Sequence, residues 1–129
     1  MRLNQDAVRD ILLFVESNLE FNKFFNLKDF YEAETLKKYD NDTIKYTLLK
    51  LSETDYLHSN PLISNNDLRD FSTGMLTWEG HEFLDTVRDK EVWSKTKAVS
   101  SKLESVSIGM LSRIGTGVIN HIIDKTMGF

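Results

Sequence analysis

The chain has no cysteine and only one proline among its 129 residues. The lack of cysteine excludes disulfides, thiolate zinc sites and cysteine nucleophiles, and it fits a reducing cytosol. No continuous apolar stretch of the secretory type follows Met1, so we expect the chain to stay in the cytoplasm of a bacterial cell. Apolar residues make up 40% of the sequence and aromatic residues 11%. That composition suffices for an ordered domain with a buried core.

Positive charge is scarce in the first two thirds of the chain. Residues 1–85 hold 9 Lys and Arg against 16 Asp and Glu, whereas residues 86–129 hold 7 against 4. Nucleic acids are bound largely through Lys and Arg at their phosphates. An acidic body of this kind therefore needs a concentrated basic patch if it is to bind DNA.

Apolar spacing predicts three helices and a short extended piece before residue 52. A helix is expected at residues 6–19 with Asn4 as its N-cap, followed by extended chain at 24–27 and a short helix at 31–38. The capping cluster at 40–42 precedes a further helix. The inward residues of that helix recur at three and four, and they are Ile44, Thr47, Leu48 and Leu51.

A β-hairpin is expected after these helices. Residues 56–58 resemble a short strand, residues 59–67 around Pro61 have the composition of a loop, and residues 68–77 form a second strand interrupted by Gly74. Helix, short helix, helix and hairpin is the order of a winged helix-turn-helix. We therefore predict a mainly α (α+β) protein, with a winged helix-turn-helix-like domain at 1–88, a small β-hairpin wing and a C-terminal helical extension at 89–129.

The C-terminal extension contains a long apolar pattern. After a helix from Thr77 and a bend at 89–90, residues 105–123 follow helical spacing, which the glycines at 109, 115 and 117 are expected to interrupt. This segment is too polar to predict a membrane span convincingly. We expect it to pack on its own domain or to form a homodimer; attachment to a membrane surface through the basic flank at 95–102 is the weaker alternative.

The stretch TWEGHEFLD at residues 77–85 begins like a zinc-binding H-E-x-x-H helix, but Asp85 stands where the second histidine would be. We interpret it instead as a helix start, capped by Thr77, with Gly80 allowing a close approach and His81 pairing with Asp85. Trp78 is expected to cover the junction. No phosphate-binding loop or nucleophile–base pair is recognisable elsewhere. We therefore expect no metal, no cofactor, no small-molecule substrate and no enzymatic activity.

The outer face of the helix after residue 40 is the candidate binding site, and two interpretations are open. For DNA, bases or phosphates would meet the helix N-terminus and the flanking lysines would meet the backbone. For a protein partner, Tyr46 and Leu49 would be the anchors. The candidate residues are Lys37, Lys38, Asn41, Lys45, Tyr46, Leu49 and Lys50.

Several segments together resemble a known family. They are RLNQDAVRDILL at residues 2–13, TWEGHEFLD with the Arg-Asp that follows at 88–89, the Val-Trp and Thr-Lys pairs at 92–97, and the closing Gly-Phe. The family comprises small uncharacterised proteins of bacteria, their phages and prophages, and is classed as a domain of unknown function. The resemblance implies a winged-helix-like fold and a mobile-element setting, and it supplies no catalytic residues. The step from Leu76 to Gly80 is also similar to the wing-to-helix step of winged-helix regulators and adaptors.

Overall fold

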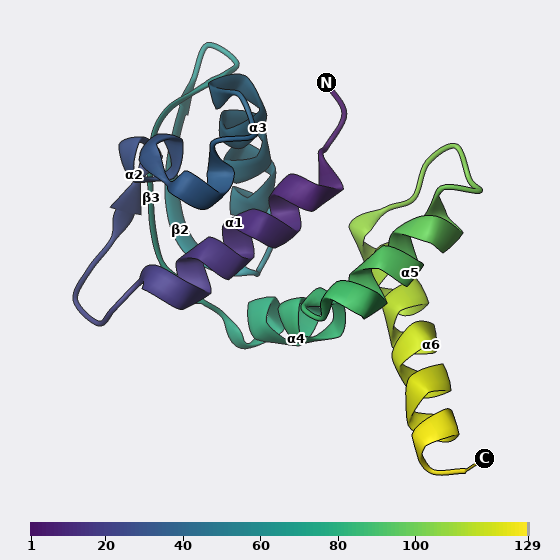
Figure 1. Ribbon diagram of the computed structural model, residues 1–129. Coiled ribbons are helices and arrows are strands. Elements are labelled where there is room, and N and C mark those ends of the chain that lie inside the picture. Colours follow the sequence, from purple (N-terminus) through teal and green to yellow (C-terminus); the bar gives the residue numbers. More distant parts are fainter. Residues whose placement is uncertain (129) are drawn as a thin grey trace. The chain divides into compact units, whose positions relative to one another are not determined.

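The computed structural model describes residues 1–128. In those residues six α-helices accompany a three-stranded antiparallel sheet, which confirms the predicted α+β class (Figure 1). The chain divides into two compact units, Met1–His81 and the part from Glu82 onward. The predicted domain boundary after residue 88 stays a prediction.

The first unit contains all three strands. Its elements, in chain order, are α1 (Gln5–Asn18), β1 (Phe25–Asn26), α2 (Leu27–Glu32), the 3-10 helix η1 (Glu34–Leu36), α3 (Asn41–Ser52), β2 (Leu57–Ser64) and β3 (Asp67–Leu76). Helix α4 (Trp78–Val87) begins directly after β3 and continues past the end of this unit.

Side-chain caps fix where these helices begin. The side chain of Asn4 accepts the N–H of Ala7 at 2.9 Å at the start of α1, as predicted. Asp40 likewise accepts the N–H of Thr43 at 2.7 Å at the start of α3. The short helix predicted at 31–38 is misplaced: α2 already begins at Leu27, because Asn26 and Asp29 form a reciprocal capping box, and only η1 follows it.

The sheet has the strand order β1-β3-β2. The loop predicted at residues 59–67 is wrong, because β2 continues to Ser64 and pairs with β3 down to Ser64–Asp67. A two-residue turn joins the strands, and both of its residues, Asn65 and Asn66, have positive φ (53° and 58°). Asparagine tolerates this conformation, which two-residue hairpins require. Pro61 is accommodated because β2 is the outer strand.

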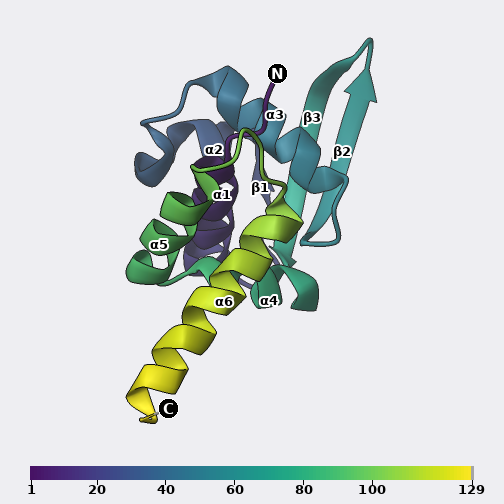
Figure 2. The ribbon, with the colours of Figure 1, turned by 90° about the vertical axis from the view of Figure 1, so that its right-hand side faces the viewer.

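An aromatic cluster lies at the centre of the first unit. The ring of Phe30, which is fully buried, lies 5.6 Å from that of Phe14, 5.9 Å from that of Phe25 and 6.0 Å from that of Phe71. These rings come from α2, α1, β1 and β3, so the cluster joins helices to sheet. Helices α1 and α3 cover one side of the β2–β3 hairpin (Figure 2).

Hydrogen bonds of Thr77 fix the junction from β3 to α4. The backbone N–H of Thr77 donates to the carbonyl of Tyr56 at 2.9 Å. Its hydroxyl accepts the N–H of Gly80 at 3.0 Å and donates to the carbonyl of Asp55. The predicted cap is therefore confirmed. The expectation that Trp78 covers the junction is wrong, because its side chain is 77% exposed.

The second unit is helical in its described residues. Helix α5 (Lys90–Ser100) is capped by Asp89, and α6 (Ile108–Thr126) is capped by Ser107 and packs on α5. The expected glycine interruptions do not occur, because α6 runs unbroken through Gly109, Gly115 and Gly117. In the chain up to residue 128, no helix has the length and apolar character that crossing a membrane requires.

Candidate functional site

Helix α3 has one buried face and one that is partly open. Ile44, Thr47, Leu48 and Leu51 are buried, which confirms the predicted inward stripe. The outward residues Lys45, Tyr46, Leu49 and Lys50 are all half-buried. The period of the helix thus presents a mixed charged and apolar surface beside the hairpin.

A hollow of about 220 Å³ lies between this face and the hairpin turn. From the turn and the start of β3 come Asn66, Asp67 and Leu68, and from α3 come four side chains in two successive turns. The complete lining is Met1, Asp42, Lys45, Tyr46, Leu49, Asn66, Asp67 and Leu68. Three of the predicted site residues, Lys45, Tyr46 and Leu49, therefore meet in one place.

An ion pair closes one side of the hollow. The Nζ of Lys45 lies 2.6 Å from Oδ1 of Asp67, and so ties α3 to the hairpin turn. The hydrogen bond from Lys45 lowers the pKa of Asp67, and the same bond raises the pKa of Lys45. Because the pKa of Asp67 is lowered in the folded chain, its contribution to stability is present above the unfolded pKa. That contribution is lost as pH falls through the folded value.

Replacing Lys45 by methionine should raise the pKa of Asp67 towards the ordinary aspartate value, since the donor is lost and the aliphatic stem is kept. Titration of the Asp67 side-chain carboxyl by carbon NMR would measure this shift. Lys50→Met is the matched control, because Lys50 pairs with Glu53 instead. An unchanged Asp67 titration in Lys45→Met would show that the ion pair does not form in solution.

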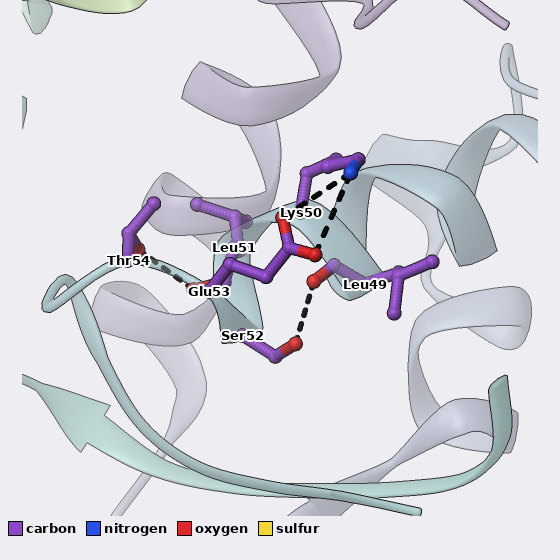
Figure 3. A network of polar contacts seen from close by, with 6 residues as sticks. All are labelled: Leu49, Lys50, Leu51, Ser52, Glu53 and Thr54. Atoms are coloured by element: carbon purple, nitrogen blue, oxygen red, sulfur yellow. Dashed lines mark hydrogen bonds and ion pairs between the residues drawn. The ribbon is translucent and has the colours of Figure 1, made fainter. Parts of the chain in front are cut away.

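Two further lysines of the predicted site are also paired with carboxylates. Lys50 lies 3.2 Å from Oε2 of Glu53, just past the end of α3 (Figure 3), and its Nζ lies 5.6 Å from the centre of the Tyr46 ring. Hydroxyl bonds from Ser52 to Leu49 and from Thr54 to Leu51 close the same helix end. Lys38 lies 3.0 Å from Oδ2 of Asp10 on α1. These lysines are therefore held by acids of the chain itself.

The N-terminal end of α3 is acidic. The carboxylate of Asp40 accepts a hydrogen bond from the N–H of Thr43, and this bond lowers the pKa of Asp40. Asn41 and Asp42 follow, both exposed. Lys37 is exposed as well, outside the hollow. The end of the helix that would meet phosphates therefore carries two carboxylates beside the predicted Asn41.

The hairpin side of the hollow was not predicted from the sequence. Asn66, Asp67 and Leu68 fell in or beside the predicted loop, so no pairing with α3 was expected. The sequence does contain a signal for this hairpin, the Asn65-Asn66 dipeptide. Two residues that tolerate positive φ, placed between strand-like segments, are typical of a two-residue hairpin turn.

The TWEGHEFLD stretch makes different contacts from those expected. His81 does not pair with Asp85: its Nδ1 lies 3.3 Å from Oε2 of Glu16 on α1, and Asp85 binds Arg88 at 2.9 Å. The acceptor on α1 is distant in sequence, which a pattern of i, i+4 contacts cannot anticipate. Throughout residues 1–128, no three His, Asp or Glu side chains gather as a group that could hold a metal ion.

Fold and site together define a small α+β protein with a partly apolar hollow between a helix and a β-hairpin. A family model described as "Hypothetical protein (DUF2513)" matches residues 2–107, so the chain belongs to that family of unknown function. An uncharacterised protein of Haemophilus influenzae is 27% identical over 124 residues, spanning 95% of this chain and 99% of the relative. No solved structure matches the chain.

Proposed function

We propose that the first unit is a winged-helix-like module whose helix α3 and β2–β3 hairpin bind another macromolecule. The support is the order of elements, helix, strand, helix, helix and hairpin, together with the strand order β1-β3-β2. In this interpretation α3 takes the place of the recognition helix and the hairpin is the wing. The TWEGHEFLD stretch is then the step from the wing to the next helix.

The macromolecule that this surface suits best is a protein. One observation carries the proposal: Lys38, Lys45 and Lys50 are each held by a carboxylate of the chain, while Tyr46 and Leu49 stand open at the hollow. A charge-balanced surface gives little of the counterion release on which DNA affinity depends. Tyrosine beside an aliphatic side chain is, by contrast, typical of protein interface anchors.

The test compares partners captured by the wild-type chain and by Tyr46→Ala from a lysate of a bacterium that carries the protein. A partner bound through this surface should bind Tyr46→Ala at least about 10-fold more weakly, as loss of a hot-spot tyrosine usually costs over about 1.4 kcal/mol. Calorimetry with the purified partner measures the difference. Phe21→Ala is the matched control, because that ring is 82% exposed and lies outside the hollow. If Tyr46→Ala binds as well as wild type, the surface is not the interface.

DNA-binding regulation is the second candidate, and the helix-and-hairpin arrangement favours it. Here the contacts to DNA would come from Lys37, Lys38, Asn41, Lys45, Tyr46 and Lys50. Lys38, Lys45 and Lys50 would first have to leave their carboxylate partners. The double variant Lys45→Glu with Lys50→Glu should then abolish binding to mixed-sequence duplex DNA, and wild-type binding should weaken steeply with salt. Absence of wild-type binding even at low salt would remove this candidate.

We further propose that the protein is non-enzymatic, acts in a phage or prophage setting and forms a homodimer through α6. The apolar positions of α6 support the last point, because only Leu111 and Gly115 are buried along its 19 residues. Sedimentation of the full chain measures whether a dimer exists, and Ile123→Glu, at an apolar residue of α6 that is 46% exposed, should abolish that dimer.

A further inference from the structure

The hollow beside α3 combines an apolar wall with a carboxylate, that of Asp42, for which the described residues provide no ion pair. Tyr46, Leu49 and Leu68 supply the wall, and Met1 contributes an exposed side chain at the rim. Of the charged side chains that line it, Lys45 and Asp67 form an ion pair with each other. The remaining charged side chain of the lining is that of Asp42, which makes no ion pair within residues 1–128.

The first unit as a whole is acidic. Residues 1–81 hold 9 Lys and Arg against 14 Asp and Glu. Arg69 approaches the other oxygen of Asp67 at 3.7 Å, but it is not among the residues that line the hollow. The pKa of Tyr31 depends on the same charges. Burial raises this pKa, Lys45 lowers it, and both Asp42 and Asp67 raise it.

We propose that the hollow receives a basic side chain, next to an apolar one, from a segment of a partner protein. The cation would pair with Asp42 at the rim, and the aliphatic stem or the apolar neighbour would lie against Tyr46 and Leu49. This inference rests on the proposed protein-binding function and specifies its chemistry. A nucleic acid would instead bring phosphates towards Asp40, Asp42 and Asp67.

The chemistry of the residues that line the hollow suits this occupant. Lysine and arginine bury their methylene stems on apolar surface while the charged head stays at the edge, where Asp42 lies. The Lys45–Asp67 pair need not break, since Asp42 is open to a new partner. A carboxylate beside the entering guanidinium accepts charge-assisted hydrogen bonds, which are stronger than neutral ones.

The experiment selects binders to the full chain from a displayed library of random short peptides and then measures the enriched peptides in solution. We expect enrichment of arginine or lysine beside a leucine, phenylalanine or similar residue. Replacing the arginine of the best peptide by citrulline, which keeps the shape and removes the charge, should weaken wild-type binding about 10-fold. The same replacement should have little effect on binding to Asp42→Asn. Glu32→Gln on α2, exposed and outside the hollow, is the control variant and should behave like wild type.

The other outcomes separate this inference from the function on which it rests. Peptides that lose binding in Tyr46→Ala but show no preference for a basic residue, or no dependence on Asp42, would overturn the inference and leave the protein-binding surface standing. Peptides that bind Tyr46→Ala as well as wild type would overturn both. Competition of the selected peptides by acidic peptides or by duplex DNA would also count against a basic occupant.

Discussion

Replacement of Phe30 by alanine is expected to lower the free energy of unfolding by about 3–5 kcal/mol, the range for removal of a buried phenylalanine. Phe30 is fully buried and its ring contacts the rings of Phe14, Phe25 and Phe71. The substitution removes three aromatic contacts and leaves a cavity where helices meet sheet. A loss of this size is a large part of the stability of a small domain.

Equilibrium urea denaturation, followed by far-ultraviolet circular dichroism, measures the change. Phe30→Leu retains part of the buried volume and should fall between alanine and wild type, so it gives a value even if the alanine variant does not fold. Phe21→Ala removes an 82% exposed ring and should stay within about 0.5 kcal/mol of wild type. Equal stability of Phe30→Leu and Phe21→Ala would show that the aromatic cluster is not packed as described.

Replacement of Gly80 by alanine should also be strongly destabilising, although alanine normally favours a helix by about 1 kcal/mol over glycine. A Cβ at residue 80 would overlap the carbonyl oxygen of Tyr56 and lie 3.1 Å from its carbonyl carbon. That carbonyl is held by the N–H of Thr77, so the backbone cannot yield cheaply. We expect a loss of about 2–3 kcal/mol, in the upper range for overpacking.

Gly117→Ala is the matched control for helix propensity, because a Cβ there meets nothing within 4 Å. It should raise the free energy of unfolding by up to about 1 kcal/mol. The two substitutions are chemically identical and lie within helices, so opposite signs would isolate the contact with Tyr56. If both variants were stabilised, the close approach of α4 to Tyr56 would be refuted.

Local signals in the sequence were sufficient for much of the fold. The caps at Asn4, Asp40 and Thr77 and the inward stripe of α3 were predicted, because each depends on residues within one or two turns of chain. The same reasoning misplaced α2, whose start depends on the reciprocal bonds of Asn26 and Asp29. Residues 59–67 were predicted as a loop from their composition, because Pro61 and the asparagines and serines outweighed the hairpin-turn signal of Asn65-Asn66.

Only the α3 side of the candidate site was predicted from the sequence. The α3 side follows from helical period, so the sequence alone places Lys45, Tyr46 and Leu49 on one face. The partners of the charged groups could not be predicted, because Lys45 meets Asp67, Lys38 meets Asp10 and His81 meets Glu16 across the fold. Three of the four lysines of this locally basic segment, Lys38, Lys45 and Lys50, are thus paired with carboxylates.

The outer strand of the sheet has a consequence for behaviour at high concentration. Strand β2 exposes Leu62 and Ile63, and an open strand edge with apolar side chains is a template for sheet extension from molecule to molecule. Pro61 lacks the N–H that such an extension needs, and the pairing register shifts between Leu57 and Ser59 and again between Leu62 and Ile63. The single proline of the chain thus lies on an open edge of the sheet, where it hinders fibrous aggregation.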